Sequence, residues 1–394
     1  MRALSDLISR ARPGERVLVR ADLNVPIAGG QVADDTRLRA SAPTIRALRE
    51  AGLRIVLCSH LGRPDGVDPK ASLAPVARAL GPLIGCAVEF SGGLPADDRS
   101  RAMVAALSPG QVALLENLRF DPREKKNDAA FARLLVEGID HFVNDGFGAC
   151  HRAHASVVAA AELRPAYAGG LVERELAALV ELRDRPERPF WLVLGGAKVS
   201  DKIGVIENLR DHVDGFVVGG GMANTLLAAA GKPVGGSRIE TDKLAEAKRS
   251  LETPGTRWEL PVDAVAAAGI DATSGETVRI GDDPGPGRML LDIGPRSVER
   301  FRAALAPART IFWNGPLGVF ENPAFAAGTR EIARHLAEHP ARVVIGGGDT
   351  AAAARLFGIA DRIHHVCTGG GAALEYLEGK ELPGIVALER SARR

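Results

Sequence analysis

The sequence has no excess of either charge. Its 394 residues include 50 lysines and arginines against 49 aspartates and glutamates, for a formal net charge of +1 at pH 7. Proteins that coat nucleic acid or bind membrane surfaces usually carry a basic excess. The balance therefore argues against nucleic acid and membranes as partners, and any anion-binding site must come from local clustering of charge.

Cysteine is scarce and long apolar runs are missing. The four cysteines, Cys58, Cys86, Cys150 and Cys367, form no C-x-x-C pair. Their scatter provides no zinc framework and is typical of a reducing cytosol. No stretch reaches the roughly 18 apolar residues of a membrane span, and the first residues contain no apolar signal-peptide core. We therefore expect a cytoplasmic protein.

The best-known nucleotide-binding signatures are also absent. There is no G-x-x-x-x-G-K-[ST] loop, and His151-Arg152 is followed by Ala153, so the protein-kinase catalytic motif is missing. Gly346-x-Gly348-x-x-Ala351 does resemble a dinucleotide-binding turn, but no carboxylate stands about 20 residues later, where the ribose would need one. An NAD-dependent oxidoreductase remains an alternative, though the weaker one.

Short apolar runs alternate with amphipathic helical patterns along the whole chain. This alternation predicts βαβ units, and the length suits two domains. We expect an α/β fold of two Rossmann-like domains, each a parallel sheet flanked by helices. The expected strands are Val17–Arg20, Arg54–Ser59, Val112–Leu118, His141–Asn144, Phe190–Leu194, Gly215–Val218, Arg309–Trp313, Arg342–Ile345 and Arg362–Cys367. The expected helices include Thr36–Ala51, Ser72–Leu80, Asp97–Leu107, Asp128–Gly138 and Ser200–Val213.

The domain boundary is expected between Ala168 and Pro189. Gly169 and Gly170 precede a helical pattern over Leu171–Arg183, which runs into the proline-rich segment RDRPERP. We interpret this pattern as an interdomain helix over about 171–185 that begins the second domain. The first domain then covers residues 1–169 and the second residues 170–371.

Positive side chains follow several expected strands of the first half. In parallel sheets, ligands bind beyond the carboxyl ends of the strands. Arginine suits such a place because its planar fork binds a carboxylate or phosphate at two points. The clustering predicts a ligand with several negative charges. The side chains concerned are Arg20, Arg37, His60, Arg63, Arg119 and Arg152.

Glycine runs follow the expected strands of the second half. They occupy positions 195–196, 219–221, 346–348 and 369–371, with a further glycine at Gly315. Glycine lets a backbone approach a ligand, and a helix N-terminus favours phosphate. Packing alone remains a competing explanation for any single turn. Asp349 either caps the following helix or binds Mg²⁺ on nucleotide phosphates, and Lys198 and Lys202 are expected to contact phosphate.

These segments together resemble the phosphoglycerate kinase family. The resemblance runs from about Val17 to Ile385. It rests on VRADLNVP, SHLGRP, LLENLRF, FVND-x-FG followed by HRAHAS, LGGAKVSDKI, VVGGGMANT, WNGPLGVFE, IGGGDT and TGGGAALEYLEGKELPGI. Any one of these segments could arise by chance, but nine in order could not.

The resemblance implies reversible transfer of the acyl phosphate of 1,3-bisphosphoglycerate to ADP with Mg²⁺, giving 3-phosphoglycerate and ATP. It implies a monomer whose two domains face a cleft that closes for in-line transfer, and a C-terminal tail over about 372–394 that packs on the first domain. A non-catalytic two-lobed anion-binding protein remains the alternative from another class.

The resemblance also assigns residues. Catalytic roles fall to Arg37, Lys198, Gly347 and Gly370. The glycerate-phosphate site would comprise Arg20, Asp22, Leu23, Asn24, Arg37, His60, Leu61, Gly62, Arg63, Arg119 and Arg152. The nucleotide site would comprise Gly195, Lys198, Lys202, Gly219, Gly220, Gly294, Asn314, Pro316, Glu321, Gly347, Gly348, Asp349 and Thr350, with Asp349 at the metal.

Overall fold

The computed structural model describes residues 1–394 and divides into two compact units. Unit 1 comprises Met1–Ala177 and Glu381–Arg394, and unit 2 comprises Ala178–Lys380. The sequence placed these divisions at 169/170 and 371/372. No helix combines the length and the apolar character needed to cross a bilayer.

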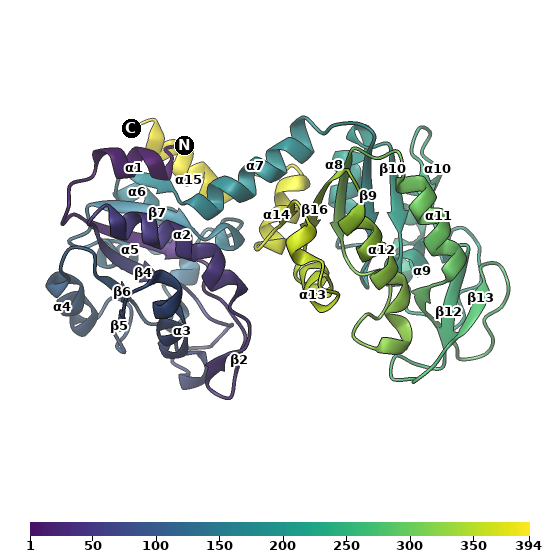
Figure 1. The fold of residues 1–394 in the computed structure, drawn as a ribbon, viewed down its shortest axis with the longest axis horizontal. Helices are drawn as coiled ribbons and strands as arrows, with labels where there is room; N and C mark the ends of the chain where they lie inside the picture. The colour runs from purple at the N-terminus through teal and green to yellow at the C-terminus, as the bar shows by residue number, and fades with distance from the viewer. The chain divides into compact units, whose positions relative to one another are not determined.

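Unit 1 is built on a six-stranded parallel sheet in the order β5-β6-β4-β1-β7-β8. Helices cover both of its faces (Figure 1). The strands are β1 Arg16–Ala21, β4 Arg54–Cys58, β5 Val88–Phe90, β6 Val112–Leu114, β7 His141–Asp145 and β8 Ala166–Ala168. The helices are α1 Leu4–Arg10, α2 Thr36–Glu50, α3 Ala74–Ile84, α4 Asp98–Ala106, α5 Ala129–Leu135, α6 Ala160–Leu163, α7 Gly170–Asp184 and α15 Pro383–Ala392, and β2 Ile27–Ala28 pairs with β3 Gln31–Val32.

The strands of unit 1 form because their apolar runs are covered on both faces, as parallel sheets require. Val19 of β1 and Leu57 of β4 are fully buried in one core with Ile45 of α2. The C-terminal helix α15 belongs to the same unit. Ser391 Oγ accepts a hydrogen bond from the backbone N–H of Ala166 in β8 at 3.0 Å.

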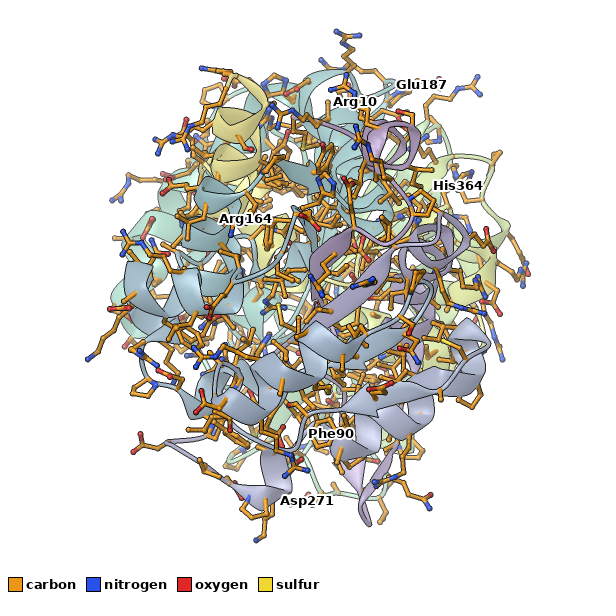
Figure 2. All side chains as sticks on the ribbon, turned by 90° about the vertical axis from the view of Figure 1, so that its left-hand side faces the viewer. Arg10, Phe90, Arg164, Glu187, Asp271 and His364 are labelled. Carbon is orange, nitrogen blue, oxygen red and sulfur yellow. The ribbon has the colours of Figure 1, made fainter.

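Figure 2 draws the side chains and labels one residue near each edge of the sheet of unit 1. Phe90 ends the edge strand β5, and Arg164 lies just before β8 at the other edge. Arg164 Nε donates to the carbonyl oxygen of Ile139 at 2.6 Å, and this bond ties the turn before β8 to the turn before β7. The carboxyl ends of the strands between these edges carry the loops described below.

Unit 2 is built on a second six-stranded parallel sheet, β11-β10-β9-β15-β16-β17. Its strands are β9 Phe190–Leu194, β10 Gly215–Val218, β11 Trp258–Glu259, β15 Thr310–Asn314, β16 Arg342–Gly346 and β17 His365–Val366. A separate antiparallel sheet joins β12 Asp263–Ala267, β13 Glu276–Arg279 and β14 Met289–Ile293. The helices are α8 Ile203–Leu209, α9 Gly220–Ala229, α10 Leu244–Glu252, α11 Pro295–Leu305, α12 Ala327–Glu338, α13 Gly348–Leu356 and α14 Gly370–Leu377.

The predicted α/β class with a parallel sheet in each half is confirmed, but several predicted elements are too long, among them the helix expected over Asp128–Gly138, which covers only Ala129–Leu135. The strand expected over Val112–Leu118 ends at Leu114. The strand expected over Arg362–Cys367 shrinks to His365–Val366. The helix expected to begin at Ser200 begins at Ile203, because the Ser200 N–H and Oγ donate to the carboxylate of Glu240 at 2.9 and 2.5 Å instead.

A buried carboxylate holds the beginning of α7, the helix that runs from unit 1 into unit 2. Asp145 Oδ1 accepts hydrogen bonds from Thr44 Oγ1 at 2.9 Å and from the Leu171 N–H at 2.8 Å. Thr44 Oγ1 in turn accepts the Gly170 N–H at 3.1 Å. Burial raises the pKa of Asp145 to about 7, and these hydrogen bonds oppose the shift. The start of α7 thus depends on an acid that costs stability when ionised.

We predict that Asp145→Asn changes the pH dependence of stability. An acid with a higher pKa in the folded than in the unfolded state binds more protons when folded, so its ionisation lowers stability as pH rises. Relative to the variant, the native protein should lose up to about 1.4 kcal/mol per pH unit between about 4 and about 7. Urea unfolding followed by circular dichroism tests this. A stability difference that stays constant over this range would contradict it.

Candidate active site

The loops at the carboxyl ends of β1, β4, β6 and β7 bring together the side chains that the sequence singled out in unit 1. Asp22 and Asn24 follow β1, His60 and Arg63 follow β4, and further arginines follow β6 and β7. Because all four strands are parallel neighbours, these loops emerge at the same edge of the sheet.

Arg119 shows how closely the cationic side chains approach one another. Burial, together with the positive charges of Arg152, Arg20 and Arg63, lowers the pKa of Arg119 to about 10 against the opposing effect of Glu124. Arg119 Nη1 donates to the carbonyl oxygen of Gly62, whereas its buried Nε has no hydrogen-bond partner. Unit 1 therefore contains a desolvated cluster of like charges that an anion would stabilise.

The two histidines beside this cluster are held neutral. Burial lowers the pKa of His60 well below its usual value, and Arg20, Arg119 and Arg37 add to the effect. Burial together with the charges of Arg20 and Arg119 lowers the pKa of His154 to about 4. At neutral pH both imidazoles act as hydrogen-bonding groups and carry no positive charge.

Arg37 reaches the site from the first turn of α2. Its Nη1 donates to the carbonyl oxygen of Asn24 at 2.9 Å and to Asp22 Oδ1 at 3.3 Å. Asn24 Oδ1 also accepts the N–H of Gly62 at 2.9 Å, joining the loop after β1 to the loop after β4. The guanidinium is thereby oriented while about a third of the side chain stays exposed.

The other predicted residues of unit 1 divide by exposure. Arg63 and Gly62 are exposed, and Arg152 is half-buried with its Nε donating to His151 Nε2 at 2.9 Å. Leu23, Leu61 and Arg20 are buried, Leu23 and Arg20 completely, so their side chains support the loops from beneath.

Sequence reasoning missed two polar residues under the site. Glu124 and Ser156 are fully buried, and Ser156 Oγ donates to Glu124 Oε1 at 2.6 Å. They lie on short turns, a 3₁₀ turn over Glu124–Lys126 and a π-helical turn over Ala155–Ala159. Neither turn has a regular hydrophobic pattern, so only the HRAHAS motif pointed to this region.

The glycine-rich loops of unit 2 pack against one another at the carboxyl ends of their strands. A Cβ atom on Gly195 would lie 2.1 Å from the carbonyl oxygen of Pro316, and one on Gly219 would lie 2.7 Å from Leu317 Cβ. A Cβ on Gly348, by contrast, would meet open space. Close loop packing therefore accounts for part of the glycine pattern, and Gly348 is among the positions left for an approaching ligand.

Several helices of unit 2 begin at glycine without a side-chain cap. The N-cap residues of α9, α13 and α14 are Gly219, Gly347 and Gly369, and none of these helices has a side-chain cap hydrogen bond. Gly347 has a φ of +92°, which an L side chain rarely adopts. Gly220 and Gly370 begin α9 and α14. In α9 the N–H groups of Gly220 and Met222 already donate to the carbonyl oxygens of Leu317 and Gly196, both at 2.9 Å. The starts of α13 and α14 are therefore the ones that present N–H groups and a positive dipole end to phosphate.

α11 differs, because a carboxylate already occupies its N-terminus. Asp263 accepts the N–H groups of Arg296 and Ser297 at 3.1 and 2.7 Å. The N-cap, Gly294, leaves room for this carboxylate, since a Cβ there would lie 2.3 Å from Asp263 Cγ. Gly294 can therefore offer a ligand its backbone surface but not an open helix end.

A lysine and a carboxylate lie near each other at the N-terminus of α13. Burial lowers the pKa of Lys202, while the neighbouring carboxylates of Asp201 and Asp349 oppose that shift. Lys202 thus lies near Asp349, an exposed residue in the first turn of α13. Lys198 and Glu321 are also exposed.

Two predicted residues beside this helix are buried. Thr350 Oγ1 accepts the Gly315 N–H at 2.6 Å and therefore supports the loop after β15. The side chain of Asn314 at the end of β15 is 1% exposed, and neither its Oδ1 nor its Nδ2 has a hydrogen-bond partner. Unsatisfied buried amides are costly, so Asn314 favours a polar ligand nearby.

A narrow, mostly apolar cleft adjoins these loops and was not predicted from the sequence. Its walls come from α9, β14 and the loop after β15. In that loop, buried Pro316 directly precedes the lining residue Leu317. The lining includes Gly220, Leu227, Leu290, Leu291 and Leu317. The lining is mostly apolar, with Asn224 and Asp292 as its polar members, and it includes Gly220 at the start of α9.

Comparison with known proteins gives one family. The family model described as phosphoglycerate kinase matches residues 8–380. The phosphoglycerate kinase of Thermomicrobium roseum is 50% identical over 396 residues, which cover 100% of both chains. That of Rubrobacter xylanophilus is 51% identical over 389 residues, which cover 98% of each chain.

Solved structures agree with these relatives. A structure of phosphoglycerate kinase from Coxiella burnetii matches with a TM-score of 0.86 and 38% identity, covering 97% of this chain and 98% of that one. A crystal structure of phosphoglycerate kinase from Pyrococcus horikoshii matches with a TM-score of 0.87 and 35% identity over 100% of both chains. The chain therefore belongs to the phosphoglycerate kinase family, and its reaction is the reversible transfer of the acyl phosphate of 1,3-bisphosphoglycerate to ADP, which yields 3-phosphoglycerate and ATP.

Proposed function

We propose that unit 1 binds 3-phosphoglycerate or 1,3-bisphosphoglycerate and that unit 2 binds the nucleotide. The observation that carries this division is the crowding of Arg20, Arg63 and Arg152 around the buried guanidinium of Arg119. Such a cluster favours a ligand with several negative charges, as both glycerate phosphates are. Arg37 and His60 complete the polar surface, and Arg20 supports it from beneath.

The nucleotide site is proposed at the glycine-rich loops of unit 2. The base would lie against Leu290 and Leu317, and the phosphates at the uncapped start of α13. The unpaired side-chain amide of Asn314 would form a hydrogen bond with the ligand. Glu321 would contact the ribose, as the family resemblance implies. The two alternatives drawn from the sequence, an oxidoreductase and a non-catalytic binding protein, do not fit the family.

The residues at the start of α13 also fit Mg²⁺ on the nucleotide. Asp349 offers an exposed carboxylate, and Mg²⁺ prefers one or two carboxylate oxygens together with phosphate and water. We assign Asp349 to hold the ion, which when bound would neutralise charge on the phosphates. Lys202, which lies near Asp349, would contact the same phosphates.

The proposed mechanism is positioning together with charge neutralisation. In the direction of ATP consumption the nucleophile is the carboxylate of 3-phosphoglycerate, which is already ionised at pH 7, so no general base is required. Arg37, Lys198 and the backbone N–H groups at Gly347 and Gly370 would stabilise the transferring phosphoryl group. Because the substrates bind to different units, the units must approach each other during turnover, and this approach would exclude water.

We further propose that the chain acts as a monomer in the cytoplasm. The family resemblance supports the first part. The four cysteines form no disulfide, which is usual in the reducing cytoplasm and supports the second part. Size-exclusion chromatography with light scattering tests the oligomeric state, and a stable dimer would refute the proposal.

A coupled assay with 3-phosphoglycerate, ATP and Mg²⁺ tests the activity directly. We expect ADP formation that depends on all three components. A protein that turned over neither glycerate phosphate would refute the function, and one that bound NADH in place of ADP would favour the oxidoreductase.

We predict that Lys198→Ala lowers kcat at least about 100-fold, because losing one donor to developing charge typically costs this much. ADP binding, measured by calorimetry, should be largely kept, since the interaction belongs to the transition state. Lys232→Ala is the matched control, because exposed Lys232 lies beyond the far end of α9. Near-normal turnover of Lys198→Ala would remove Lys198 from the mechanism.

We predict that Arg37→Ala leaves ADP affinity unchanged while turnover falls at least about 100-fold. The guanidinium is held by Asn24 and Asp22 in unit 1, so its loss should not affect the nucleotide site. Arg46→Ala on the same helix serves as the control, since exposed Arg46 bonds the carbonyl oxygen of Leu83 instead. Wild-type kcat in Arg37→Ala would show that the substrate site lies elsewhere.

A further inference from the structure

A fully buried guanidinium lies directly behind the imidazole of His60. Arg20 is 0% exposed, and each of its three nitrogen atoms has a partner. Nη1 donates to the carbonyl oxygen of Ala21 at 2.5 Å, Nε donates to Ser156 Oγ at 3.0 Å, and Nη2 lies 2.9 Å from His60 Nδ1. Arg20 thus links the fully buried Ser156 to the half-buried His60, whose ring lies at the proposed substrate surface.

The contact between Arg20 and His60 allows only one form of the imidazole. A guanidinium nitrogen can donate a hydrogen bond but cannot accept one, so His60 Nδ1 must be the acceptor. A neutral imidazole with a free Nδ1 carries its proton on Nε2. An imidazolium would direct an N–H at the N–H of Arg20. The positive charges of Arg20, Arg119 and Arg37 oppose that form as well, since with burial they hold the pKa of His60 well below its usual value.

The other end of Arg20 is fixed by a carboxylate. Ser156 Oγ accepts from Arg20 Nε and can therefore give its own proton only to Glu124 Oε1, at 2.6 Å. The Ser156 N–H donates to Glu124 Oε2 at 3.0 Å, so one residue satisfies both carboxylate oxygens. Glu124 is 0% exposed, and its Oε1 lies 3.7 Å from His154 Nδ1. The π-helical turn Ala155–Ala159 presents both groups of Ser156, and such turns often occur at functional sites.

We propose that Glu124, Ser156 and Arg20 form a positioning chain that fixes His60 as the neutral tautomer protonated on Nε2, so that His60 meets the substrate as a hydrogen-bond donor. The proposal rests on the proposed role of unit 1 in binding 3-phosphoglycerate. Glu124 balances the charge of Arg20, and the chain of hydrogen bonds runs from a buried acid to the substrate surface.

A fixed tautomer serves the recognition of an anion. Carboxylate and phosphate oxygens accept hydrogen bonds, so a histidine with its proton on the hidden Nδ1 would direct a lone pair at them. A freely titrating histidine would change its charge and its donor pattern near neutral pH. Arg20 prevents both changes without contacting the ligand, which makes it, with Ser156 and Glu124, a positioning residue and not a catalytic one.

The tautomer can be measured directly in the native protein. Long-range ¹H–¹⁵N correlation spectra distinguish a protonated from an unprotonated ring nitrogen, and the loss of one set of signals in His60→Gln assigns His60. We expect protonated Nε2 and unprotonated Nδ1 from about pH 5.5 to about pH 8.5, a range that includes the ordinary histidine pKa. Titration within this range, or a proton on Nδ1, would overturn the proposal.

The kinetic test breaks the chain at Ser156, which is remote from the ligand. Ser156→Ala should raise the KM for 3-phosphoglycerate roughly ten-fold, the value of one well-made hydrogen bond, with kcat and the KM for ATP nearly unchanged. Ser156→Thr keeps the hydroxyl and should restore the KM. Val158→Ala, a half-buried apolar change in the same π-helical turn, controls for loosening of the turn.

Three outcomes would count against the chain. Equal effects of Ser156→Ala and Val158→Ala would show a purely structural role, as would a KM that Ser156→Thr does not restore. Glu124→Gln keeps a side chain of the same size and tests the charge. We expect a mixture of His60 tautomers in its spectra, because Arg20 loses the carboxylate that fixes its position through Ser156, and unchanged His60 signals would exclude Glu124 from the chain.

Failure of the inference differs from failure of the proposed function. Adding 3-phosphoglycerate to the native protein should shift the His60 signals. If they shift but report a proton on Nδ1, only the positioning chain is wrong. If they report the expected tautomer yet ignore 3-phosphoglycerate while ADP is bound normally, the assignment of the substrate to unit 1 is wrong.

Discussion

The repulsion between like charges at one edge of a parallel sheet is the constraint on which the site of unit 1 depends. The loops after β6, β4, β1 and β7 leave the sheet at the same edge, because these strands are parallel neighbours. The loops therefore hold Arg63, Arg119 and Arg152 close together. Burial of Arg119 makes the repulsion more costly because little water screens it. A polyanionic ligand relieves this cost, and Glu124 relieves part of it in the free protein.

The proposed phosphate site of unit 2 is built from different chemical groups than the arginine cluster of unit 1. Its strand ends carry glycine runs in place of an arginine cluster, and their loops approach each other so closely that Gly195 has no room for a side chain. This packing brings the uncapped start of α13 beside the loop after β15, where the amide of Asn314 is buried without a partner. Backbone dipoles and one orphaned amide thus take the place of the arginines of unit 1.

Much of this arrangement could be predicted from the sequence, because the strands are continuous apolar runs and the ligand-binding side chains follow them directly. The runs at Phe190–Leu194 and Gly215–Val218 coincide with β9 and β10. The same reasoning failed where a distant side chain competed with a local pattern. Ser200 has the chemistry of a helix N-cap, yet Glu240, forty residues away, takes both of its donors.

The supporting groups could not be predicted, because they depend on contacts between segments far apart in the chain. Nothing near Arg20 in the sequence shows that it is fully buried, or that Ser156 lies against its Nε. Glu124 lies on a short irregular turn, where hydrophobic periodicity gives no signal. The antiparallel sheet of β12, β13 and β14 was likewise missed. Its strand β13 is largely exposed and has no apolar run, although β12 and β14 are mostly buried.

The central claim is that a desolvated guanidinium cluster in unit 1 binds the glycerate phosphate. Arginine Nε–H signals in ¹H–¹⁵N spectra test it most directly, because the buried Nε of Arg119 has no partner in the free protein. We predict that 3-phosphoglycerate shifts the Arg119 signal and that ADP alone leaves it in place. A signal that ignores 3-phosphoglycerate, or one that responds only to ADP, would contradict it.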